Sequence, residues 1–217
     1  MIRVKICGNK SIDEVLSASN LGADAVGLIV GVSHFSEDAI EPNIARKILN
    51  KIPVFVTVVL VTHMKTLEEI LRIYEEVPAP VIQLQDDISI SEVEKIRKAL
   101  PLVKLIKAIH VIDDSSVNTA IKLAHFFDAI LLDSIEVKED KIGGTGKVHD
   151  WNISRKIVSL IKKPVILAGG LTPDNVVDAI SYVKPYGVDV NSGVDNIDGK
   201  KSPEAVEYFI NRSKSCL

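Results

Sequence analysis

Two residues at the ends of apolar runs, Cys7 and Asp133, could carry acid–base chemistry. Cys7 closes the run RVKIC (3–7) directly before Gly8, and Asp133 closes the run DAILLD (128–133). A thiolate can accept a proton, and a carboxylate that closes an apolar run needs either solvent or a functional reason. The alternative for Cys7 is a packed thiol, because a free cysteine often behaves as a small hydrophobe.

Glycine-rich segments follow three of the later apolar runs and could bind an anion. They are GGTGK (143–147), AGGLTPDN (168–175) and VNSGVD (190–195). Glycine lets backbone N–H groups approach an anion closely, and a helix N-terminus adds a favourable dipole. Each segment alone fits a tight turn, but the three together favour a phosphate site.

Strands and helices alternate along the chain and must position these residues. Short β-branched runs predict eight strands, each followed by a stretch of helical period. The predicted strands are 3–7, 25–30, 54–61, 80–85, 103–109, 128–133, 164–169 and 187–191. The predicted helices are 11–22, 41–52, 66–77, 89–100, 115–126, 150–161, 172–183 and 202–213.

Capping signals support several of the predicted helices. A Ser or Thr stands three residues before a Glu, which is the capping-box spacing, or directly before a proline at the first helical position. The box pairs are Ser11 with Glu14, Thr66 with Glu69 and Ser91 with Glu94, and the proline pairs are Thr172-Pro173 and Ser202-Pro203.

Eight β/α units in 217 residues predict a single-domain (β/α)8 barrel over residues 1–217, with a doubly wound sheet as the fallback. Ligands of such a barrel bind where the strands end, and loops after strands seven and eight commonly hold phosphate. Alternation places Lys5 on the same face as Cys7. Strand eight adjoins strand one in a closed barrel, so we expect Asp189 to pair with Lys5 and the cation to favour the Cys7 thiolate.

The composition excludes several classes of protein. A formal charge of −3 provides no basic field to attract nucleic acid or an anionic membrane, and the longest apolar run (53–61) is too short to span a bilayer. Two distant cysteines suggest neither zinc nor a disulfide scaffold, and strand-like residues begin at once without a signal peptide. We expect a soluble, cytoplasmic protein without a metal. A monomer and a homodimer are both compatible with the sequence.

In this order, seven motifs resemble the phosphoribosylanthranilate isomerase family from end to end. They are VKICG, GADAVGLI, LLDS, GGTGKVHDW, LAGGLTPDNV, YGVDVNSGV and GKKSPEAV. The resemblance implies a (β/α)8 barrel that acts in tryptophan biosynthesis without a cofactor. It implies an Amadori rearrangement of N-(5-phosphoribosyl)anthranilate to 1-(2-carboxyphenylamino)-1-deoxyribulose 5-phosphate, a small phosphorylated substrate and product.

The same resemblance implies a role for individual residues. Cys7 is then the general base and Asp133 the general acid, while Asp189 holds sugar hydroxyls. Gln83 and Gln85, at the end of the fourth strand, are expected to contact substrate as well. The expected phosphate-binding residues are Gly144, Gly169, Gly170, Asn191, Ser192 and Gly193.

The chain departs from the family pattern at three places. Many members carry an arginine after strand two that reads the anthranilate carboxylate, but the loop GVSHFSEDAIEP (31–42) has none, so we expect His34 and Ser36 to replace it. Gln85 stands where the family has a histidine, and Asn191 where it has a serine. The remaining histidines, at 63, 110, 125 and 149, show no ligand spacing and are interpreted as surface or cap residues.

Two other functions are compatible with the barrel. One is another aminoaldose phosphate isomerase, such as the one of histidine biosynthesis, which uses an aspartate where this chain has Cys7. The other is a catalytically idle barrel that binds a phosphorylated metabolite as a sensor or scaffold. Loss of the arginine after strand two would permit the idle barrel, whereas the presence of both Cys7 and Asp133 argues against it.

Overall fold

A computed structural model describes residues 1–134 and 149–216. The eight parallel strands close into a barrel in chain order, and β8 pairs with β1. The strands are β1 Arg3–Ile6, β2 Ala25–Ile29, β3 Thr57–Thr62, β4 Val81–Leu84, β5 Lys104–Val111, β6 Ala129–Ser134, β7 Val165–Leu167 and β8 Gly187–Val190. The predicted (β/α)8 barrel is confirmed.

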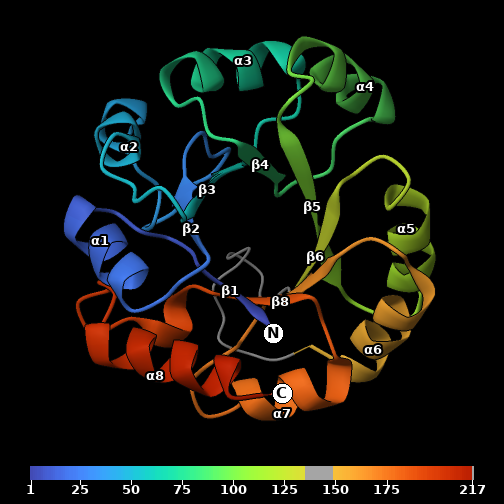
Figure 1. Cartoon of the computed structure of the whole chain (residues 1–217). Helices are drawn as coiled ribbons and strands as arrows, with labels where there is room; N and C mark the ends of the chain where they lie inside the picture. The colour runs from blue at the N-terminus through green and yellow to red at the C-terminus, as the bar shows by residue number, and fades with distance from the viewer. Residues whose placement is uncertain (135–148, 217) are drawn as a thin grey trace.

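The helices form an outer ring around the strands (Figure 1). They are α1 Ile12–Asn20, α2 Pro42–Leu49, α3 Leu67–Glu76, α4 Ile90–Ala99, α5 Ser115–Leu123, α6 Trp151–Leu160, α7 Val176–Val183 and α8 Pro203–Lys214, with a short 3₁₀ helix, η1, at Ser192–Val194. No helix within the described ranges is both long and apolar enough to cross a membrane.

Strand alternation divides the buried side chains into two cores. Residues such as Leu60, Ile82 and Ile130 face outward and pack against the helices in the larger cluster. Val59, Val61 and other alternate residues fill the barrel interior in a second cluster, to which Cys7 belongs. Because successive side chains of a strand point to opposite faces, the position of Cys7 places Lys5 inside the barrel too.

The third predicted strand begins too early in the sequence. Residues 54–56 form a turn ahead of β3, and Val54 and Phe55 are 92% and 97% exposed. The apolar composition of this segment therefore reflects an exposed connection on the molecular surface rather than a buried strand.

Two helix starts also differ from the prediction. Ser89, and not Ser91, caps α4, because its side chain accepts the backbone N–H of Glu92. Helix α7 begins at Val176 and not beside Thr172: Asn175 occupies the N-cap position, and its side-chain oxygen accepts the N–H of Thr172. The full capping box predicted at Thr66 and Glu69 is present, and Ser202 caps α8 with Pro203 in its first turn.

Candidate active site

Cys7 follows β1 and lies inside the barrel mouth, 6% exposed. Lys5, two residues earlier and on the same face, forms a buried ion pair with Asp189 of β8, with 2.8 Å between Nζ and Oδ2. The two strands pair in register at these residues, so the predicted contact is confirmed. Gly27 of β2 provides the necessary space: a Cβ there would lie 2.6 Å from the Cys7 sulfur.

Burial and charge have opposite effects on the Cys7 thiol. Burial raises its pKa, the Lys5 cation lowers it, and the Asp189 carboxylate raises it again, leaving the pKa above the ordinary value. The Lys5 cation favours the thiolate, as expected, but desolvation outweighs it and the thiol pKa stays raised. Burial lowers the pKa of Lys5, but Asp189 and the Cys7 thiolate raise it by more than burial lowers it, so the ammonium stays charged.

Asp133 is the penultimate residue of β6 and is held by side-chain amides from β4 and from the residue after it. Gln85 donates from Nε2 to Asp133 Oδ2 at 3.1 Å, and Gln83 donates to Gln85 Oε1 at 2.9 Å. The backbone N–H of Ser134 donates to the other carboxylate oxygen at 2.9 Å. The structure thus brings both predicted glutamines to the predicted acid.

The environment of Asp133 favours its protonated form. Burial raises the pKa of this carboxyl group; His110 opposes that rise, and the carboxylate of Asp189 adds to it. His110 is the register partner of Asp133 on β5, so it belongs to the barrel mouth. Its interpretation as a surface or cap residue is wrong.

The glycine-rich turns after β7 and β8 contact each other. Gly169 and Gly170 have φ of +77° and +69°, which favours glycine. A Cβ at Gly193 would lie 1.9 Å from the carbonyl oxygen of Leu171, so only glycine lets the turn after β8 approach the turn after β7 this closely. Packing therefore accounts for part of the glycine pattern. Gly144, also predicted to bind phosphate, lies outside the described residues.

Ser192 and Asn191 differ in how far their side chains are engaged. Ser192 begins η1 directly after Asn191. The Asn191 amide nitrogen donates to Asp38 at 2.8 Å, and its oxygen accepts from Lys201 at 2.7 Å. Both polar atoms of the Asn191 side chain are thus already engaged by the protein, and its contact with phosphate stays a prediction.

The loop after β2 brings His34 to the mouth beside His63. The two rings lie 4.6 Å apart, edge to face, and His63 Nδ1 is 3.1 Å from Asp86. Burial lowers the pKa of His63, against the effect of Asp86, which raises it. The interpretation of His63 as a surface or cap residue is wrong. Ser36 lies in the same loop, where its carbonyl accepts the N–H of Ala39.

Lys107 of β5 is a buried residue of this site that the sequence motifs do not indicate. Its Nζ donates to the carbonyl oxygens of Ala108, at 2.5 Å, and Gln85, at 3.4 Å. Burial lowers its pKa to about 8, although Asp87 and Asp86 act in the opposite direction. Lys107 thus fixes the end of β4 from which Gln85 reaches Asp133; a lysine inside an apolar run was the available signal.

The chain matches the family model for N-(5'-phosphoribosyl)anthranilate isomerase over residues 4–212. N-(5'-phosphoribosyl)anthranilate isomerase 2 of Methanosarcina mazei is 42% identical over 214 residues, which cover 99% of this chain and 95% of that protein.

Two solved structures of phosphoribosyl anthranilate isomerases share the fold over 99% of this chain and 100% of theirs, each with a TM-score of 0.84. One, 31% identical, shows mutually generated monomers of the dimeric isomerase of Thermotoga maritima. The other, 32% identical, is a complex with reduced 1-(o-carboxyphenylamino)-1-deoxyribulose 5-phosphate. The chain belongs to the phosphoribosylanthranilate isomerase family, the isomerases of tryptophan biosynthesis.

Proposed function

We propose that this isomerase rearranges N-(5-phosphoribosyl)anthranilate with Asp133 as general acid and Cys7 as general base. The observation that carries the assignment is the continuous arrangement of Cys7, Lys5, Asp189 and Asp133 across the mouth, in which a thiol and a carboxyl group share one charged environment. General acid–base catalysis needs two such groups on either side of one substrate.

In the first step, Asp133 gives its proton to the furanose ring oxygen, and the ring opens to a Schiff base. Cys7, as the thiolate, then removes the proton from C2′, and the resulting enolamine tautomerises to the ketone. A raised pKa suits Asp133 because the acid must be protonated at the start. Lys5 suits Cys7 because a cation opposes the burial that would otherwise keep the thiol protonated.

The phosphate group of the substrate is assigned to the turns after β7 and β8. Gly169, Gly170, Ser192 and Gly193 lie there, and the close approach of the two turns at Gly193 and Leu171 brings their backbones to one place. Glycine-lined backbone at strand ends is suited to binding a phosphate through N–H groups. Gly144 completes this assignment from the sequence.

The rest of the substrate is assigned to side chains of β8 and β4 and to the loop after β2. Asp189 and Gln83 each have a buried side-chain oxygen without a hydrogen-bond partner among the described residues, and both could accept a hydrogen bond from a sugar hydroxyl. His34 and Ser36 are the assigned donors for the anthranilate carboxylate, and Gln85 is assigned to contact substrate beside the acid, to which it donates a hydrogen bond.

The test is the rate at which freshly prepared phosphoribosylanthranilate disappears, followed by its fluorescence. We expect Cys7→Ala and Asp133→Asn each to lower kcat by about three orders of magnitude, since general acid–base groups contribute up to about 10⁴-fold. Cys216→Ala is the matched control, because it removes a thiol in the C-terminal segment. A folded wild type without turnover would favour the idle phosphosugar-binding barrel instead.

We also propose a homodimer and a cytoplasmic location. The Thermotoga maritima relative is described as dimeric, and the adjacent Val54 and Phe55 are apolar side chains almost entirely exposed here. Exposed apolar clusters often mark contacts between proteins. Light scattering should therefore give twice the chain mass, and Phe55→Asp should give the mass of one chain.

The proposed cytoplasmic location is compatible with the free thiols Cys7 and Cys216, since a reducing compartment keeps thiols unpaired.

A further inference from the structure

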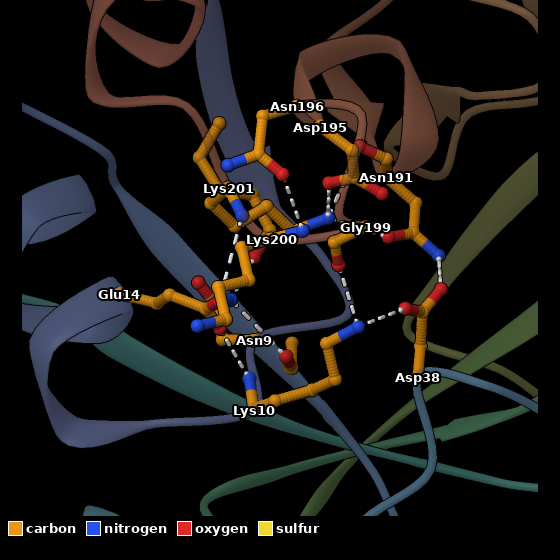
Figure 2. Close-up of polar contacts among 12 residues, drawn as sticks. Asn9, Lys10, Glu14, Asp38, Asn191, Asp195, Asn196, Gly199, Lys200 and Lys201 are labelled. Carbon is orange, nitrogen blue, oxygen red and sulfur yellow. Dashed lines mark hydrogen bonds and ion pairs between the residues drawn. The ribbon is translucent and has the colours of Figure 1, made fainter.

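Three loops at the barrel mouth meet in a polar network around Asp38, shown in Figure 2. Asp38 comes from the loop after β2 (residues 30–41). Its Oδ1 accepts from Lys10, which follows β1, at 3.2 Å, and its Oδ2 accepts from Asn191, which follows β8, at 2.8 Å. One carboxylate therefore connects the loop after β2 to two other loops. Lys10, Asp38 and Asn191 are called the cross-loop clamp below.

Lys201 holds Asn191 from the other side. Lys201 is 7% exposed, and its Nζ donates to the Asn191 side-chain oxygen at 2.7 Å, to the Asn191 carbonyl at 3.1 Å and to Asp195 at 2.6 Å. Because Lys201 only donates and Asp38 accepts, the amide of Asn191 has one orientation that satisfies both. A serine at this position has one oxygen and could not span the two partners in the same way.

The clamp also touches the turn that follows Cys7. Gly8 has φ of +69°, and a Cβ on it would lie 2.2 Å from the Asn191 side-chain oxygen. Asn191 thus lies directly over the Cys7–Gly8 turn. Lys201 is close enough to lower the pKa of the Cys7 thiol, although less than burial raises it. Asn191 therefore contacts both the turn after Cys7 and the loop after β2.

The position of Asp38 makes Asn191 a poor ligand for phosphate. A phosphate bound to the Asn191 amide nitrogen would approach a carboxylate oxygen that is 2.8 Å from that nitrogen. Like charges at such a distance repel strongly, most of all where water is partly excluded. The amide N–H groups of Asn191 are therefore better suited to binding Asp38 in the loop after β2 than to binding the substrate.

We propose that Asn191 and Asp38 are a positioning pair that fastens the loop after β2 to the mouth beside Cys7 before substrate binds, and that Asn191 does not bind phosphate. The loop carries His34 and Ser36, so fastening it reduces the ordering that substrate binding would otherwise require. The kinetic part of this inference rests on the proposed function. Its expected signature is a change in KM at nearly constant kcat.

The test is a reciprocal exchange of the two side chains. Asn191→Asp places a second carboxylate against Asp38, and Asp38→Asn places two amides there without the charge that Lys10 contacts. We expect each single variant to raise KM about tenfold, with kcat within about twofold of wild type. In the double variant an amide at 38 can donate to a carboxylate at 191, which still accepts from Lys201, so KM should return to within about twofold.

Glu37→Gln is the matched control, because it removes a carboxylate next to Asp38 from an exposed residue. It should leave KM unchanged. If Asn191 bound phosphate, the carboxylate of Asn191→Asp would repel the substrate whatever stands at position 38. A double variant no better than Asn191→Asp would therefore overturn the proposal.

Hydrogen exchange of the free protein tests the clamp without any turnover. The amide of Ile40 donates to Ile29, and that of Ala39 donates to Ser36, so both report on the loop after β2. Their exchange should be at least about tenfold faster in Asn191→Asp and return towards wild type in the double variant. Unchanged exchange in Asn191→Asp overturns the clamp even if the enzyme is active. An inactive wild type overturns the proposed function, and exchange still decides on the clamp.

Discussion

The reactivity of Cys7 depends on the balance between burial and one ammonium group. Burial disfavours the thiolate, and Lys5 is the largest influence in the opposite direction. Asp189 keeps Lys5 charged, but its own negative charge also raises the pKa of the thiol. The Lys5–Asp189 pair is therefore a compromise between holding the cation in place and activating the base.

Replacing Lys5 with glutamine should raise the pKa of Cys7 further, because the cation that opposes burial is lost. Each pKa unit reduces the thiolate about tenfold at a pH below the midpoint. The measurement is the pH dependence of iodoacetamide alkylation, in a Cys216→Ser background so that only Cys7 reacts. The midpoint should move to higher pH.

The double variant Lys5→Gln/Asp189→Asn is the control, because it avoids an unpaired buried carboxylate. Its midpoint should also rise, but less, since Lys5 influences Cys7 more than Asp189 does. A midpoint that stays constant or falls in Lys5→Gln would contradict the role assigned to the cation.

Gln85 acts on the acid of the pair in the opposite sense to burial. Its donation to Asp133 stabilises the carboxylate and so lowers the pKa of that group. Gln85→Leu should raise the pKa, and the protonated acid should then persist to higher pH. The limb of the kcat profile that reports the titration of Asp133 should move to higher pH.

Gln83→Leu is the comparison for Gln85→Leu, because Gln83 reaches Asp133 only through Gln85. It should move the same limb by a smaller amount. Equal shifts in the two variants would mean that the glutamines act by packing and not by the hydrogen bond to the carboxylate. The two acid–base groups titrate as a pair, so the profile reports macroscopic values.

At the scale of the elements, the cap of α4 shows that a local sequence pattern does not always decide where a helix begins. Both Ser89 and Ser91 stand three residues before a glutamate, but only Ser89 has extended backbone and accepts the N–H of Glu92. The side chain of Glu92 accepts the N–H of Leu67 at the start of α3 instead of completing a capping box. Glu92 thus joins the start of α4 to the start of α3, a contact that the Ser–Glu spacing does not predict.

Ser89→Ala should destabilise the protein by about 1 kcal/mol, the usual cost of losing an N-cap side chain. Ser91→Ala, within the first turn of α4, should change the free energy of unfolding by less than about 0.5 kcal/mol. Urea unfolding of both variants measures the difference. Equal losses would show that Ser91 shares the capping role through its contact with Ser89.

The strands and the face on which each residue lies could be predicted from the sequence, because alternation and closure have fixed geometry. The Lys5–Asp189 pair joins residues 184 apart, yet a closed barrel requires their strands to adjoin. The contact between Asp38 and Asn191 could not be predicted in this way, because both residues lie in loops, whose sequences have no periodicity. The start of α7 differs for a similar reason: Asn175 folds back to Gly170 and Thr172 instead of leaving Thr172 to cap the helix.

At the scale of the whole molecule, closure makes stability a shared property of the strands. Each strand has two neighbours in the sheet, and β8 is no exception because it pairs with β1. We therefore expect residues 1–217 to unfold as one domain. Buried groups other than the proposed acid–base pair then contribute to the same free energy of unfolding, and His149, before α6, is one of them.

The stability should decrease in mild acid because of His149. Burial lowers its pKa to about 4 from the ordinary 6.5, and its Nε2 lies 2.6 Å from Ser154 Oγ. Below about pH 6.5 the unfolded chain binds a proton that the folded protein does not bind until about pH 4, so unfolding is favoured as the pH falls through this interval. At pH 5 the loss should be about 2 kcal/mol relative to pH 7. The free energy of unfolding in urea, measured at both pH values, should show this loss in wild type. It should show the same loss in His125→Gln, which changes an exposed histidine, but His149→Gln should lack the part of the loss that is due to His149. The same loss in all three proteins would assign the acid sensitivity to other groups.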